Sequence, residues 1–125
     1  MIIDTHAHII VPEILREAAP AEEWRPRVVW ENNKQFVEYG PKRIGSATRE
    51  FVTPEKILNE MKKSGVDAVL LCPWVSLVRY EAKAEESLSA CQVQNDALSS
   101  LVKKYPQKIA ALGMIPLQDV ALAIK

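Results

Sequence analysis

The sequence predicts an α/β fold with a parallel sheet, because short apolar segments alternate with amphipathic helices. The first apolar segment opens the chain at 2–11, and two nearly continuous ones follow at 66–72 and 109–115. Segments of this kind are typical of strands buried on both faces. Helices are expected at 54–64 and 82–104, each between two of these strands. Strand–helix–strand units with this order favour parallel pairing.

The first element is a short strand, since Ile2 and Ile3 favour extended backbone and Pro12 closes the segment. Residues 13–50 are the least regular part of the chain, with several prolines and glycines. Strand-like fragments lie at 28–30, 35–39 and 43–46. We therefore expect an insertion of loops and short hairpin strands over 13–50.

The two helices have clear signals. Thr53 is the expected N-cap, Pro54 takes the first helical position, and Gly65 ends the helix. The second helix carries a stripe at three- and four-residue spacing and ends before Pro106. Its members are Leu88, Cys91, Asn95, Leu98, Val102 and Tyr105. Within the stripe, Cys91 is expected in the core, and Asn95 is expected to hydrogen-bond a loop backbone. A third helix begins near Asp119 and has no stop signal before Lys125.

The composition of the chain excludes several classes of function. The chain has 125 residues, with 16 basic and 16 acidic side chains, which suits one domain or part of a larger one, here residues 1–125. Balanced charge excludes a strong electrostatic footprint for nucleic acid or an anionic membrane. No apolar run reaches the roughly 20 residues of a membrane span, and the start lacks the features of a signal peptide. Two cysteines do not make a disulfide scaffold. A cytoplasmic protein is expected.

The two histidines of the chain, His6 and His8, lie at the end of the first predicted strand. Residues two apart in a strand point to the same face, so both imidazoles are expected to converge, with Asp4 one step back on that face. Two neutral imidazoles at this spacing can bind one zinc ion at about 2.0–2.1 Å each. The strand ends are also where α/β proteins bind ligands. The sequence predicts a divalent-metal site at His6 and His8; a polar loop without metal is the alternative.

Three further residues near the strand ends have a functional and a structural interpretation. Asp4 either contacts the metal or accepts hydrogen bonds that fix the strand end. Cys72 ends the second buried strand and offers a thiolate, although a buried free cysteine more often packs as a small apolar residue. Trp74 follows at the same edge, where it either walls a substrate pocket or caps the core.

These motifs resemble a known family. Ile3–Ile9 is similar to the opening of the amidohydrolase superfamily of metal-dependent (β/α)8 barrels. The segments 48–50, 54–61, 65–67, 91–96 and 105–116 resemble the aminocarboxymuconate-semialdehyde decarboxylase branch, often called amidohydrolase 2. The resemblance runs along residues 1–125 and is weakest over 13–47.

The resemblance implies about three βα units from the start of a TIM-type (β/α)8 barrel, with an irregular insertion after the first strand. It implies a divalent metal, usually zinc, held by His6, His8, and a histidine and an aspartate from later strands. It also implies a further histidine that acts as acid and base, and the chain has no third histidine for either role. In the decarboxylase members such a site removes a carboxylate from a conjugated or aromatic acid without an organic cofactor. The expected partner is therefore a small carboxylic acid.

The sequence departs from the family at the arginine that binds the substrate carboxylate. Ser46 occupies that position, so Arg43 and Arg49 are the nearby candidates, together with Trp74 as a pocket wall. We expect these residues to be the amino-terminal piece of a metal-dependent decarboxylase and to be inactive alone. Two alternatives stay open. One is a metal-dependent hydrolase, a phosphoesterase of the TatD type, which opens with a similar Asp-x-His-x-His. The other is a non-catalytic chain that oligomerises through exposed barrel edges.

Overall fold

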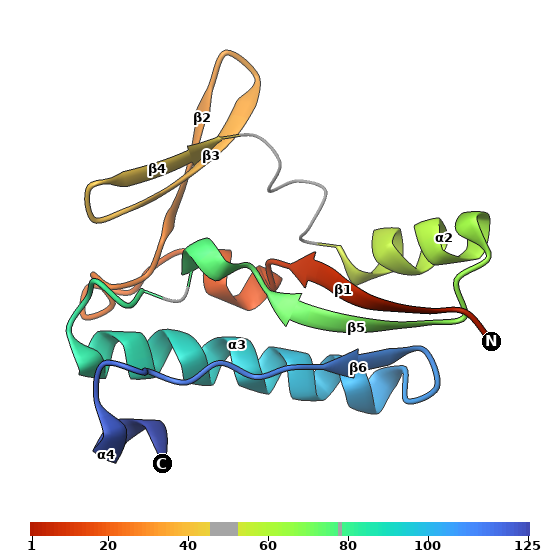
Figure 1. Ribbon diagram of the computed structural model, residues 1–125. Helices are drawn as coiled ribbons and strands as arrows, with labels where there is room; N and C mark the ends of the chain where they lie inside the picture. The colour runs from red at the N-terminus through yellow and green to blue at the C-terminus, as the bar shows by residue number, and fades with distance from the viewer. Residues whose placement is uncertain (46–52, 78) are drawn as a thin grey trace.

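The computed structural model describes residues 1–45, 53–77 and 79–125. These residues form a parallel sheet of three strands and an antiparallel sheet of three strands (Figure 1). The elements in chain order are β1 (Ile3–Ile9), η1 (Pro12–Leu15), β2 (Arg27–Glu31), β3 (Lys34–Tyr39), β4 (Lys42–Gly45), α2 (Pro54–Ser64), β5 (Ala68–Pro73), η2 (Val75–Leu77), α3 (Ala84–Lys104), β6 (Ile109–Ala111) and α4 (Val120–Ala123).

The parallel sheet confirms the predicted α/β fold. Its strand order is β1-β5-β6, with β5 paired in parallel to both neighbours. Helix α2 precedes β5, and α3 connects β5 to β6. The strand expected over 109–115 is shorter than predicted and ends at Ala111. Beyond it, the backbone of Met114 pairs with the side-chain amide of Asn95 on α3 and not with a strand.

Helix α2 begins and ends at the predicted residues. Pro54 takes the first position, and Gly65 adopts φ of 73°, a left-handed conformation that suits glycine. Thr53 takes the N-cap position as predicted, although its side chain makes no capping hydrogen bond. Its carbonyl oxygen instead accepts from the backbone N–H of Lys56 and of Ile57.

The predicted strand fragments of the 13–50 insertion form the antiparallel sheet β2-β3-β4, as far as residue 45. Asn32 and Asn33 connect β2 to β3 with positive φ values of 49° and 62°, the conformation of a type I′ hairpin turn. This sheet stands beyond the carboxyl ends of β1 and β5 (Figure 1). The insertion is therefore placed at the end of the parallel sheet where the histidines lie.

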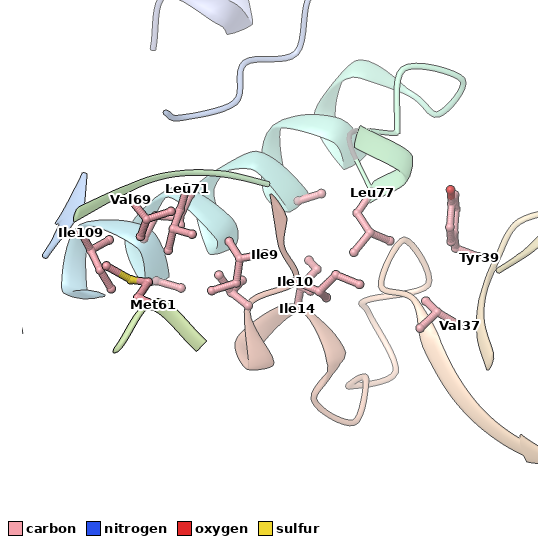
Figure 2. Packing of buried hydrophobic residues seen from close by; sticks show 14 residues of the cluster. Ile9, Ile10, Ile14, Val37, Tyr39, Met61, Val69, Leu71, Leu77 and Ile109 are labelled. Carbon is pink, nitrogen blue, oxygen red and sulfur yellow. The ribbon is translucent and has the colours of Figure 1, made fainter. Parts of the chain in front are cut away.

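One hydrophobic core joins both sheets (Figure 2). At its centre Ile9, Ile10, Ile14 and Leu71 are at most 1% exposed. Further core residues from β3, α2, β5, η2, α3 and β6 are Val37, Tyr39, Met61, Val69, Leu77, Ala90, Ala97, Leu98 and Ile109. The core holds the start of the insertion against the ends of β1 and β5.

The outer strands of the parallel sheet, β1 and β6, each have one unpaired edge among the described residues. Apolar side chains near these edges are exposed: Ile2 by 60%, Ile3 by 48% and Leu112 by 52%. The helices of the described ranges include none that is long and apolar enough to cross a bilayer.

Candidate metal centre

The backbone of β1 is irregular where the two histidines lie. In the pairing with β5, Asp4 is opposite Val69, but Ala7 is opposite Leu71, so β1 contains one extra residue between these pairs. Such a bulge changes the direction of nearby side chains. Asp4 is thus in register with Val69, and its exposed side chain lines a pocket that His6 and His8 also line.

The side chains of His6 and His8 meet at their outer nitrogens. The two Nε2 atoms are 3.1 Å apart, and the rings stand edge to face with centroids 4.8 Å apart and an interplanar angle of 79°. His6 is exposed and His8 is partly buried. Without a metal, this distance suits a hydrogen bond in which one Nε2 carries the proton and the other accepts it.

Backbone and neighbouring groups orient both histidines. The Nδ1 atom of His8 lies 3.4 Å from the carbonyl oxygen of Pro73 on β5, which favours a proton on Nδ1 and a lone pair on Nε2. The Oδ1 atom of Asp4 accepts a hydrogen bond of 3.0 Å from the backbone N–H of His6. Asp4 therefore fixes the strand end, as one of its two expected roles requires.

The histidine pair fits a divalent metal. Two imidazole nitrogens that ligate one ion at about 2.0–2.1 Å, at an angle of roughly 90–110°, are about 2.9–3.4 Å apart. The observed separation of 3.1 Å lies inside that range. Among the described residues, no group of three or more His, Cys, Asp or Glu side chains is arranged to hold a metal ion. The described residues thus offer two candidate ligands from one strand, and a complete zinc site would need others.

A groove of about 710 Å³ lies beside the histidines and is lined by residues of β1, α2 and β5. His6 and His8 line it, together with Lys56 and Glu60 of α2. Ile57 and Met61 give the same groove an apolar floor. The space beside the imidazoles is thus open and mixed in character, as a ligand site requires.

The other predicted site residues lie elsewhere. Arg43 is on β4, where its guanidinium pairs with Glu31 at 2.6 Å and Glu38 at 3.3 Å and stacks on Phe36. Its role in binding a substrate carboxylate stays a prediction, and Arg49 is outside the described residues.

Trp74 and Cys72 are both close to the end of β5. Trp74 is partly buried and packs against the hydrophobic core, and its role as a pocket wall stays a prediction. Cys72 is a partly buried free thiol opposite His8 in the strand register.

Three buried polar residues were not predicted from sequence patterns. Arg25 is 2% exposed, Arg79 is 9% exposed and Gln94 is fully buried. Arg25 pairs with Glu22, and its hydrogen bonds are the main reason why the pKa of Glu22 falls to about 2. Long polar side chains are normally expected on the surface, so only the tertiary contacts identify these residues.

Tyr39 is a buried hydroxyl of the same region. Its phenol donates a hydrogen bond to the carbonyl oxygen of Ser76. Burial, and then the nearby carboxylate of Glu81, raise the pKa of Tyr39 above its usual value. The hydroxyl therefore remains a hydrogen-bond donor at neutral pH.

Two solved structures are similar to the described fold. One is 2,6-dihydroxybenzoate decarboxylase from Rhizobium, with a TM-score of 0.64, 18% identity, and coverage of 97% of this chain and 32% of that one. The other is the Metarhizium anisopliae protein named IDCase, in its apo form, with a TM-score of 0.74, 14% identity, and coverage of 98% and 37%. This chain thus spans about a third of either protein, and the likeness establishes the fold alone. No protein-family model matches the sequence.

Proposed function

We propose that these residues belong to a metal-dependent enzyme of the amidohydrolase superfamily that removes a carboxylate from a small conjugated or aromatic acid. The observation that carries the proposal is the convergence of the Nε2 atoms of His6 and His8 at 3.1 Å. The likeness in fold to a decarboxylase of a dihydroxybenzoate supports the choice of reaction.

The unpaired edges of the parallel sheet support a larger barrel. Both β1 and β6 have exposed apolar residues beside a free edge, which an isolated sheet would leave open to solvent and to other chains. Further strands would pair with these edges and cover Ile3 and Leu112. The same strands would bring the remaining metal ligands to the carboxyl end of the sheet.

In the proposed site, His6 and His8 hold the ion, zinc being the preferred metal, through their Nε2 atoms. When bound, such an ion supplies a Lewis acid and lowers the pKa of a coordinated water. The carbonyl of Pro73 keeps the Nδ1 proton of His8 in place, so that Nε2 presents its lone pair. Asp4 fixes the backbone of His6 in the bulge. Binding and orientation are thus the work of this chain, and the proton donor to the substrate comes from residues outside it.

The metal site is tested on the purified chain by titration with Zn²⁺ and measurement of bound metal by mass spectrometry. We expect weak Zn²⁺ binding by the parent chain, because two imidazoles are only part of a complete site, and no measurable binding by His6→Ala or His8→Ala, because either change leaves one imidazole. Thr5→Ala is the matched control, since Thr5 is on the same strand and is not a proposed ligand, and it should bind as the parent does. Retention of metal in both histidine variants would contradict the proposal.

The reaction is tested by adding 2,6-dihydroxybenzoate and related hydroxybenzoates and following release of CO₂. We expect none from the 125 residues alone, because both histidines serve as ligands and no third one is present. The same residues joined to the missing strands should release CO₂, and His6→Ala should remove that activity. Hydrolysis of a phosphodiester without release of CO₂ would favour the phosphoesterase alternative.

A further inference from the structure

The antiparallel sheet has little core of its own. Among its strand residues, Val37 and Tyr39 are the buried hydrophobic ones, and Ile44 is partly buried against the same core. A sheet of three short strands with so few buried side chains is not expected to be stable by itself. Its order therefore depends on contacts with the rest of the molecule, including the segment that follows β5.

Arg79 is at the centre of those contacts. Its guanidinium donates from Nη1 to the carbonyl oxygen of Trp24 at 2.6 Å, and from Nε to Glu81 at 3.2 Å. The same group is 5.1 Å from the ring centre of Tyr39, and Nη2 is 3.9 Å from Glu86. One side chain thus contacts the segment before β2, the end of β3 and the start of α3.

Neighbouring bonds complete the same connection. Tyr39 donates its hydroxyl hydrogen bond to the carbonyl oxygen of Ser76 on η2, shortly before Arg79 in the chain. Lys42 on β4 pairs with Glu81 at 3.3 Å. Glu81 thus contacts both Lys42 of the antiparallel sheet and Arg79 of the segment after β5. These bonds tie the antiparallel sheet to the segment that follows β5.

The backbone of Arg79 is also unusual. Its φ of 63° is in the left-handed region, which a residue with a long side chain rarely adopts. Such a conformation persists where the surrounding contacts determine it. The carbonyl of Arg79 accepts from the side chain of Gln118 at 3.4 Å, so its main chain is held as well as its side chain.

We propose that Arg79 is a positioning residue that fixes the antiparallel sheet β2-β3-β4 against the loop after β5. The sheet then forms a fixed wall at the end of the parallel strands. The idea that this wall borders a substrate site rests on the proposed function. The attachment of the antiparallel sheet through Arg79 does not. Loss of Arg79 would release the sheet while β1 and β5 keep their pairing.

Hydrogen exchange of the intact chain, resolved by mass spectrometry, tests the attachment of the antiparallel sheet through Arg79. We expect Arg79→Met to speed exchange over 27–45 by about tenfold or more and over 3–9 and 68–73 by less than about twofold, as in local rather than global opening. Arg79→Lys keeps the charge but lacks the planar fork, so its effect should be intermediate. Tyr39→Phe removes one hydroxyl and should give a smaller change with the same pattern.

Arg43→Met is the matched control, because Arg43 makes its ion pairs and its stacking contact within the antiparallel sheet. Its effect on 27–45 should stay below about threefold. Equal acceleration along the whole chain, an equal effect of Arg43→Met, or no change in Arg79→Met would overturn the proposal. If Arg79→Met fails to fold, the pattern in Tyr39→Phe decides in the same way.

Zn²⁺ binding measured on the same samples separates this inference from the metal site. Arg79→Met should bind the metal as the parent does. Absence of metal from the parent would leave the exchange result intact and would count against the proposed function alone.

Discussion

The side chain of Asn95 takes the place of a neighbouring strand for the segment after β6. Its Oδ1 accepts from the backbone N–H of Met114, and its Nδ2 donates to the carbonyl of the same residue, both at 2.8 Å. Met114 is 7% exposed, so water is a poor substitute for these bonds. The expected hydrogen bond from Asn95 to a loop backbone is confirmed. We predict that Asn95→Ala destabilises the protein through Met114.

The size of the effect follows from the two bonds. Each hydrogen bond contributes roughly 0.5–1.5 kcal/mol, and a buried group left unpaired costs more, so the loss is about 2–3 kcal/mol. Alanine is a better helix former than asparagine by about 0.6 kcal/mol, which offsets part of that loss. The net expectation is a decrease of about 2 kcal/mol in the free energy of unfolding.

Urea denaturation of three variants measures this decrease. Gln92→Ala is the control, because Gln92 is exposed on the same helix and should change stability by less than about 0.5 kcal/mol. Asn95→Asp keeps the acceptor for the N–H of Met114 but turns a second oxygen toward its carbonyl, so it should be at least as destabilising as alanine. Equal stability of Asn95→Ala and Gln92→Ala would refute the reasoning.

Three further predictions concern single residues. Gly65→Ala should lower stability by about 1 kcal/mol in thermal unfolding through its positive φ alone, because an added Cβ would meet no atom within 4 Å; unchanged stability would contradict this. Arg25 is the main reason why the pKa of Glu22 falls from 4.5 to about 2, so ionised Glu22 should stabilise the fold at pH values above 4.5. The stability difference between the parent and Glu22→Gln should therefore shrink as pH falls from 4.5 toward 2, and a constant difference would count against the ion pair. Burial raises the pKa of Cys91, so a thiol reagent should modify it more slowly than Cys72, and equal rates would be inconsistent with the packing.

Much of the fold could be predicted from local signals. Pro54 and Gly65 bracket α2 because each suits the backbone conformation of its end of the helix. The strand fragments of the insertion were also predicted, because prolines and glycines punctuate residues 13–50 between them. The predicted end of the third parallel strand was wrong. The strand stops early because the backbone of Met114 pairs with the side chain of Asn95, 19 positions away, which local patterns do not reveal.

The candidate site was predictable only in part. Alternation along a strand brings His6 and His8 together, and the structure places their Nε2 atoms side by side. Alternation did not foresee the bulge between Asp4 and Ala7, because a bulge depends on pairing with β5. Buried cations such as Arg79 were missed for the same reason: their partners come from distant segments.

The most direct test of the central claim is the ¹⁵N spectrum of the two imidazoles before and after addition of Zn²⁺. The chain has two histidines, so four ring nitrogens are observed and can be assigned with His6→Ala and His8→Ala. A shared metal should shift the Nε2 resonances of both residues together, while Nδ1 of His8 stays protonated against Pro73. A shift confined to one histidine, or no shift in a large excess of zinc, would contradict a metal site built on this pair.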